Sequence, residues 1–273
     1  MITNNFFIVA AIVIYLLVML AIGVVFSKNN SNTEDFYLGG RKLGPFVTAM
    51  SAEASDMSSW LLMGLPGVAY LSGVCDAAWT AIGLGIGTYL NWLFVARRLR
   101  RYSANINAFT VPSFYSKRFH DDKNILNAIC ALVIVIFFIP YTASGFAACG
   151  KLFNSLFGVD YMAAMVVSAI VIVGYTIMGG FKAVSTTDFI QSCVMTIALV
   201  VVLGFGITAA GGSDAVMANA NSMAGYLSLT AMHDAASGTA SPYGFITIIS
   251  TMAWGLGYFG MPHIILRFMA IED

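Results

Sequence analysis

The sequence predicts an all-α membrane protein with about seven transmembrane helices. Of its 273 residues, 59% are hydrophobic and only 10% are charged, whereas a soluble domain carries about 25% charged residues. The mean hydropathy is +0.83, and the apolar residues form runs long enough to cross a hydrocarbon core of about 30 Å. Because backbone groups in lipid must be hydrogen-bonded internally, we expect these runs to be helices rather than isolated strands.

Polar segments rich in turn residues separate the apolar runs. The predicted spans are residues 5–27, 46–70, 76–96, 125–149, 161–180, 188–210 and 243–267. Residues 1–26 have neither a basic leading region nor an A-x-A-like cleavage site, so we interpret them as a retained first span. The segment 211–242 is predicted to be an external loop with room for a short surface helix. No soluble domain fits between the spans, so residues 1–273 are predicted to form a single transmembrane domain.

The distribution of basic residues predicts the orientation of these spans. Of the 13 Lys and Arg residues, only Lys151 lies outside one alternating set of loops and span ends. The positive-inside rule then places the N-terminus outside and the end of the seventh span in the cytoplasm. The basic stretch 97–101 lies at a membrane boundary, so we interpret it as a topology determinant that contacts anionic lipid rather than nucleic acid. The same topology also describes a seven-helix receptor.

The sequence offers little support for metal or soluble-enzyme chemistry. The four cysteines form no C-x-x-C pair and have no histidine at metal-ligand spacing, so we interpret them as small buried hydrophobic residues. We find no P-loop, nucleophile elbow, H-E-x-x-H motif or dinucleotide fingerprint. The chain is therefore not expected to be an enzyme.

The second span contains two acidic residues and several helix-weakening residues. Glu53 and Asp56 lie within it, and serines 51, 55, 58 and 59 surround them. A carboxylate inside a membrane is costly and indicates a functional site. A structural pair with a neighbouring helix is the alternative for Asp56, and close helix packing is the alternative for the serines. Gly64, Pro66 and Gly67 are expected to weaken the helix beyond them.

The seventh span is the second interrupted segment. It carries glycines 255, 257 and 260 followed by Pro262. Two interrupted spans indicate a transporter binding site, because broken helices expose carbonyls for a cation and a helix N-terminus for a carboxylate. Trp254 and Tyr258 are one α-helical turn apart and are predicted to face the same cavity. Ordinary packing or an interfacial position remains the alternative for both.

Two further residues stand in apolar surroundings. We interpret His263, which follows Pro262, as a buried histidine with hydrogen-bond partners. Tyr141 follows Pro140 in the fourth span, where the proline is expected to kink the helix and free carbonyl groups.

Four stretches of the chain resemble the sodium/solute symporter family, and most specifically its proline-transporting branch. They are residues 36–46, 51–67, 179–188 and 254–270. The resemblance implies a five-plus-five inverted-repeat fold preceded by an extra first helix. Residues 1–30 would be that helix, 45–210 the first repeat and 243–267 the first helix of the second repeat. Family members are much longer, so the resemblance implies a fragment with an incomplete second repeat.

The resemblance also implies a sodium-coupled importer of L-proline in the plasma (inner) membrane, with sodium as the co-transported ion and the lipid bilayer as its surroundings. Sodium would bind the backbone carbonyls of Ala54 and Met57, with Asp56 nearby. The residues implied in substrate binding are Ser58, Trp60, Tyr141, Trp254 and Tyr258. Those implied in coupling or gating are Asp56, Arg41 and Glu53, and Arg41 is expected to pair with a carboxylate at the inner mouth.

Two departures from the family pattern keep alternatives open. Met261 stands where proline transporters often have glutamine, so another amino acid, a carboxylate or pantothenate is the alternative substrate. Glu53 stands where a small residue is expected and adds an acid close to Asp56. A seven-helix receptor or sensor is the alternative of another class, and it requires unbroken helices through residues 54–60 and 254–260. A non-functional remnant is the third possibility.

Overall fold

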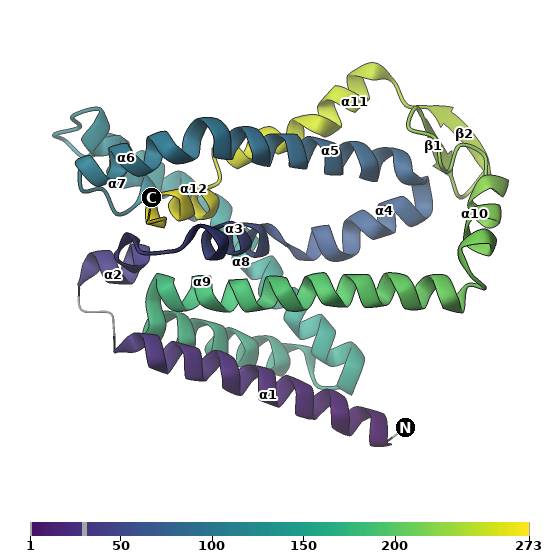
Figure 1. Ribbon diagram of the computed structural model, residues 1–273, viewed down its shortest axis with the longest axis horizontal. Coiled ribbons are helices and arrows are strands. Elements are labelled where there is room, and N and C mark those ends of the chain that lie inside the picture. The colour runs from purple at the N-terminus through teal and green to yellow at the C-terminus, as the bar shows by residue number, and fades with distance from the viewer. Residues whose placement is uncertain (1, 29–31, 273) are drawn as a thin grey trace. The chain divides into compact units, whose positions relative to one another are not determined.

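The computed structural model describes residues 2–28 and 32–272 and is mostly helical (Figure 1). Its α-helices are α1 (Ile2–Ser27), α2 (Thr33–Leu38), α3 (Pro45–Asp56), α4 (Leu65–Ser72), α5 (Val74–Asn91), α6 (Arg97–Asn105), α7 (Val111–Arg118), α8 (Ile125–Phe157), α9 (Tyr161–Ala209), α10 (Ser213–Ser222), α11 (Phe245–Met252) and α12 (Pro262–Ala270). The 3₁₀ segments are η1 (Gly39–Arg41) and η4 (Ala253–Phe259), and the π-helical segments are η2 (Trp60–Gly64) and η3 (Trp92–Ala96). The strands are β1 (Ala231–Asp234) and β2 (Thr239–Pro242).

The chain divides into two compact units, each described by itself below. The first unit comprises Met1–Asp56, Leu99–Ile190 and Pro262–Asp273. The second unit comprises Met57–Arg98 and Gln191–Met261. Two of the four boundaries, after Asp56 and after Met261, fall within the two spans that were predicted to be interrupted.

Within the described residues, four helical stretches are long and apolar enough to cross a membrane. They are Phe7–Ser27, Val74–Asn105, Ile125–Phe157 and Tyr161–Ala209. Two shorter apolar helices, Trp60–Ser72 and Phe245–Phe259, lie in the spans that were predicted to be interrupted. All seven predicted runs therefore contain helix, although two of them are divided into shorter pieces.

The helix α9 contains two of the predicted spans. At 49 residues it would be about 74 Å long if straight, which is more than twice the thickness of a hydrocarbon core. Gly180 interrupts it with φ 60° and ψ −162°, non-helical values that suit glycine. The predicted spans 161–180 and 188–210 left residues 181–187 as a non-helical connection. This prediction is wrong, because the chain is helical again immediately after Gly180.

In the first unit, the C-terminal helix α12 supplies much of the buried core. It packs against α2, α3 and α7, and Phe268, Met269 and Ala270 are fully buried. Just beyond α12, Ile271 forms a parallel β-bridge with Leu43, which lies between η1 and α3. These contacts fix the start of α3 and therefore the position of the polar residues along it.

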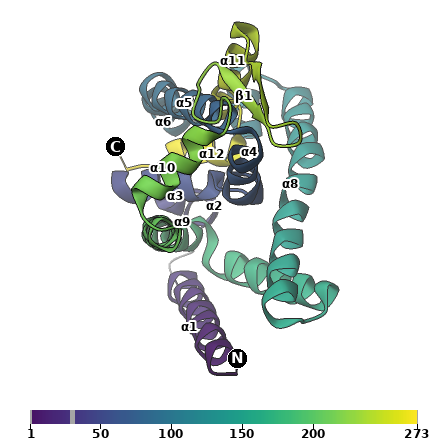
Figure 2. The same ribbon diagram turned by 90° about the vertical axis from the view of Figure 1, so that its right-hand side faces the viewer.

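In the second unit, α5 packs along η4, α11 and α4 (Figure 1). The β1–β2 hairpin lies against α4 and α5 (Figure 2). Two hydrogen bonds fasten the segment before the hairpin to α5: the Trp79 indole donates to the Leu229 carbonyl at 2.7 Å, and the Val74 amide donates to the Tyr226 carbonyl at 2.8 Å. The amino end of α5 is therefore held by the long loop.

The hairpin is the exception to the all-α prediction. The segment 211–242 does carry a short helix, α10, but its second half pairs β1 with β2 in an antiparallel register from Ala231–Pro242 to Asp234–Thr239. A tight turn joins the strands: the Gly238 amide donates to the Asp234 carbonyl at 2.8 Å, and Gly238 has φ +67°. Each strand has only four residues, too few for a clear alternating pattern in the sequence.

The Asp234 carboxylate in this turn is expected to make the hairpin sensitive to acid. It accepts hydrogen bonds from the Ser237 hydroxyl at 2.6 Å and the Ala236 amide at 3.0 Å, and these lower the pKa of Asp234 below its ordinary value of 3.8. A lowered pKa means that the stabilisation is present above 3.8 and is lost as the pH falls through the folded value. Carboxyl NMR titration should give a midpoint below 3.8, and Asp234→Asn should abolish it. A midpoint at or above 3.8 would contradict the turn geometry.

Candidate functional site

The first interruption lies immediately after Asp56, where α3 ends. Met57 and Ser58 are not helical, and the chain becomes helical again at Ser59. The last carbonyls of an α-helix lack intrahelical partners, so the end of α3 exposes backbone oxygens near Ala54 and Met57. The Ser58 hydroxyl accepts from the Leu61 amide at 3.4 Å and begins the next helix. This predicted break is confirmed.

The helix that follows the first break starts as the π-helix η2. Pro66 has no amide hydrogen and therefore cannot donate to the preceding turn. In the wider π turn the amide of Leu65 donates to the Trp60 carbonyl instead. The helix then runs through Gly67 to Ser72 without a break. Gly64, Pro66 and Gly67 thus change the helix type here, and the interruption itself lies earlier in the chain.

The second interruption occupies the predicted glycine-rich segment. The helix α11 ends at Met252 and tightens into the 3₁₀ segment η4. The Gly260 amide donates to the Gly257 carbonyl at 3.0 Å, Met261 is not helical, and α12 begins at Pro262. Glycine disfavours an α-helix and proline is well suited to a helix start, which explains both ends of the break.

Two of the four predicted substrate-binding residues in the second unit form an aromatic pair. The Trp60 and Trp254 rings are stacked with centroids 4.3 Å apart and planes inclined by 29°. Tyr258 is 6% exposed, whereas Trp254 is 48% exposed. The two residues are therefore not one α-helical turn apart, because both lie in the 3₁₀ segment η4. The cavity that they were predicted to face stays a prediction. Residues four apart align on an α-helix, but a 3₁₀ segment aligns residues three apart, so η4 turns Tyr258 away from Trp254.

Tyr141 lies in the first unit and contacts the end of α3. Its hydroxyl donates to the Ser55 carbonyl at 3.3 Å, so it engages one of the carbonyls near the break. The helix α8 runs from Ile125 to Phe157 with Pro140 inside it, so the proline does not end the helix. Tyr141 also stacks on His263, with ring centroids 5.7 Å apart.

His263 differs from its prediction. It is packed between Tyr141 and Phe138, whose ring centroid is 5.3 Å away. Neither ring nitrogen has a hydrogen-bond partner among the described residues. The expected hydrogen-bonded histidine is therefore wrong, because aromatic rings rather than polar groups surround the imidazole.

A buried ion pair in the first unit was not predicted from the sequence. Arg267 and Asp188 are 2.8 Å apart, with side chains 5% and 13% exposed. Asp188 Oδ2 also accepts from the hydroxyls of Ser51 at 2.8 Å and Ser55 at 3.1 Å. Arg267 donates to both serine hydroxyls and to the His263 carbonyl. The sequence does contain a signal for this ion pair, because Asp188 and Arg267 are opposite charges that lie in two separate apolar runs.

This ion-pair network involves two of the four serines of the second span, Ser51 and Ser55. Ser51 and Ser55 lie one turn apart on α3 and bind the same carboxylate and the same guanidinium. Helix contact is therefore their observed role in the described structure. Glu53, on another face of α3, is exposed, and Asp56 at the helix end is partly buried.

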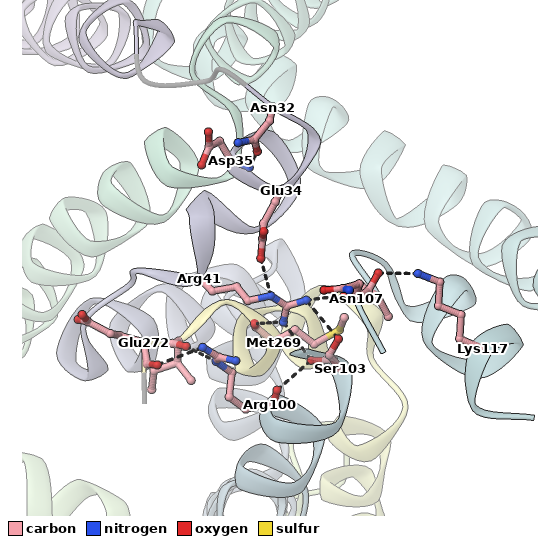
Figure 3. Close-up of polar contacts among 12 residues, drawn as sticks. Asn32, Glu34, Asp35, Arg41, Arg100, Ser103, Asn107, Lys117, Met269 and Glu272 are labelled. Atoms are coloured by element: carbon pink, nitrogen blue, oxygen red, sulfur yellow. Dashed lines mark hydrogen bonds and ion pairs between the residues drawn. The ribbon is translucent and has the colours of Figure 1, made fainter. Parts of the chain in front are cut away.

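Arg41 is the centre of a second polar cluster of the first unit (Figure 3). It is 8% exposed and has φ 53°, following Gly39 and Gly40 in the same left-handed conformation. Its Nε donates to Glu34 at 2.8 Å, which agrees with the expected pairing with a carboxylate. The two other nitrogens donate to Ser103 Oγ at 3.1 Å and to the carbonyls of Met269 at 2.9 Å, Ala108 at 2.7 Å and Ser103 at 3.3 Å.

We expect Arg41→Lys to lower the stability of the first unit by about 1–3 kcal/mol, although it conserves the charge. Arg41 makes five hydrogen bonds from a planar group, and a lysine ammonium has three donors at one point. Thermal unfolding in detergent would measure the change, with the exposed neighbour Lys42→Arg as the control. Equal midpoints for both variants would show that the cluster contributes little.

The structure is similar to a solved sodium-coupled symporter. It superposes with a TM-score of 0.75 on a chain described as the substrate-bound outward-open state of a Na⁺-coupled sialic acid symporter, covering 98% of this chain and 54% of that one. The sequences are 19% identical, so this likeness concerns the fold. The chain is mostly helical and has the fold of a Na⁺-coupled symporter.

The chain belongs to the sodium:solute symporter family, whose model matches residues 36–273. It is therefore a multi-pass membrane protein. It is 45% identical to the osmoregulated proline transporter OpuE of Bacillus subtilis over 97% of this chain, and 42% identical to a sodium/proline symporter of Staphylococcus aureus over 96%. The chain spans about half the length of these relatives, 52% and 49% respectively. The receptor alternative is excluded by the family and by both helix breaks.

Proposed function

We propose that this chain acts in the sodium-coupled import of L-proline. Relatives named as proline transporters match nearly the whole chain at 42–45% identity, and this observation carries the proposal. The two interrupted helical segments support it, because they expose the backbone groups that bind a small cation and a zwitterion. Another amino acid, a carboxylate or pantothenate remains the alternative substrate, and a competition panel against labelled proline would separate these.

Sodium, in this proposal, binds the carbonyls of Ala54 and Met57 on either side of the end of α3. Asp56 contributes its charge nearby and couples sodium binding to the conformational change, together with Glu53 and Arg41. A ligand shifts a conformational equilibrium only through its different affinities for the two states. Sodium would therefore favour the outward-open state, and joint occupancy would permit closure.

L-Proline, in the same proposal, contacts two groups of residues. Trp60 and Trp254 supply stacked aromatic surface, and Ser58 and Tyr258 flank them in the chain. Tyr141 of α8 is proposed as a substrate-binding residue on the family resemblance alone. Residues 1–30, 45–210 and 243–267 are proposed as the extra helix, the first repeat and the first helix of the second repeat, with the N-terminus outside.

Uptake of radiolabelled proline into cells that lack proline transport would test the function. This chain is expressed as it stands, and also joined to the second half of the B. subtilis relative, each in sodium and in choline medium. We expect sodium-dependent uptake by the joined form and its loss on Asp56→Asn. Equal uptake in sodium and choline would refute sodium coupling, and absence of uptake by a membrane-inserted joined form would refute proline as substrate.

A further inference from the structure

A close backbone approach in the second unit joins α5 to the interrupted segment. Three residues of α5, four apart from one another, meet three residues of α11 and η4 that are three apart. The contacts join Gly83 to Met252, Gly87 to Gly255 and Asn91 to Tyr258. All three residues of α5 are buried.

The two spacings match because the two helix types have different rises. Four residues of an α-helix rise about 6 Å, and three residues of a 3₁₀ segment also rise about 6 Å. Every fourth residue along α5 therefore lies level with every third residue along η4. This pairing of residues three apart exists only while residues 253–259 keep their 3₁₀ conformation, since three residues of an α-helix rise only about 4.5 Å.

Asn91 supplies the only side-chain hydrogen bond that the described structure gives to these three contacts. It is 1% exposed, and its Nδ2 donates to the Tyr258 carbonyl at 2.9 Å. Its Oδ1 is buried and accepts no hydrogen bond from the described residues. The contact therefore depends on the donor half of the amide. Burying an amide with an unsatisfied oxygen costs free energy of folding. What the Asn91 side chain contributes in return is its contact with η4.

We propose that Asn91 is a positioning residue for the substrate site. Its amide holds the Tyr258 carbonyl and thereby fixes the 3₁₀ segment that carries Trp254 and Tyr258. The stack of Trp254 on Trp60 then has the geometry that proline meets. This inference rests on the proposed function for its effect on transport, but the effect on the tryptophan pair is independent of any substrate.

The first test measures the tryptophan pair in this chain without substrate. Stacked indoles give an exciton-coupled circular dichroism band, which Trp254→Phe identifies by abolishing it. We expect Asn91→Leu to reduce the band at every pH. Asn91→Asp should keep it near pH 6, where a buried protonated carboxyl can donate to the Tyr258 carbonyl, and reduce it near pH 9, where a carboxylate repels that carbonyl.

A buried residue of the same helix provides the matched control. Thr80 is 1% exposed and its hydroxyl donates to Asp76 within α5, away from Tyr258. Thr80→Val therefore removes a hydrogen bond of α5 without touching η4, and it should leave the band unchanged. Equal loss in Thr80→Val and Asn91→Leu, or a pH-independent band in Asn91→Asp, would overturn the proposal.

The second test uses the form joined to the second half of the relative, once the parent transports proline. We expect Asn91→Asp to raise the KM for proline about tenfold near pH 9 and much less near pH 6, with a smaller change in kcat. If the tryptophan band changes but the KM for proline is the same at pH 6 and pH 9, Asn91 positions the tryptophan pair without affecting proline binding. That outcome would overturn its role in the substrate site. No transport by the parent would instead refute the proposed function and leave the spectroscopic result standing.

Discussion

Arg267→Leu is expected to lower the free energy of unfolding of the first unit by about 3–5 kcal/mol. The substitution leaves the Asp188 carboxylate buried without its cation, and both serine hydroxyls on α3 lose a donor. Breaking one side of a buried ion pair costs far more than the pair contributes, because the remaining charge keeps its desolvation penalty. Thermal and denaturant unfolding in detergent would measure the loss.

The double variant Arg267→Leu with Asp188→Leu is the control for this interpretation. It removes both charges, so it should be markedly more stable than Arg267→Leu alone. The difference from additivity gives the coupling between the two residues. A double variant that is less stable than the single one would mean that hydrogen bonds to Ser51 and Ser55, rather than the unpaired charge, dominate.

The helix breaks could be predicted from the sequence because their causes are local. Gly255, Gly257, Gly260 and Pro262 lie within eight residues of one another and weaken an α-helix wherever they occur. The acid- and serine-rich end of α3 is also a local signal, although the break follows Asp56 and does not fall at Gly64 or Gly67 as their composition alone suggests. Local composition thus indicates that a helix changes, but not at which residue.

Features that depend on distant partners could not be predicted in the same way. Asp188 and Arg267 are 79 residues apart in the sequence. The apolar residues around each of them do not indicate which opposite charge it pairs with. The different exposures of Trp254 and Tyr258 accompany the 3₁₀ conformation of η4, which packs against α5. A 3.6-residue period was assumed for them, and the tighter 3₁₀ turn rotates the second ring away.

Gly87→Ala is expected to destabilise the second unit by about 1–3 kcal/mol, despite the higher helix propensity of alanine. A Cβ at Gly87 would lie within 3.0 Å of the backbone of Gly255, a distance that real Cβ atoms essentially never show. The obstructing atoms belong to the backbone of η4, so no side-chain rotation relieves the contact. Relief requires η4 to move away from α5, which would also break the register with Asn91.

Gly85→Ala provides the matched control on the same helix. A Cβ at Gly85 meets nothing within 4 Å, so this variant should gain about 1 kcal/mol from helix propensity alone. The two glycines are two residues apart in one α-helix, and therefore differ in what they face rather than in local conformation. Unfolding midpoints that shift in opposite directions would establish the close packing of α5 on η4. If both variants raised the unfolding midpoint equally, η4 would have room to move away from α5. The 3₁₀ conformation of η4 would then have a cause other than its contact with Gly87.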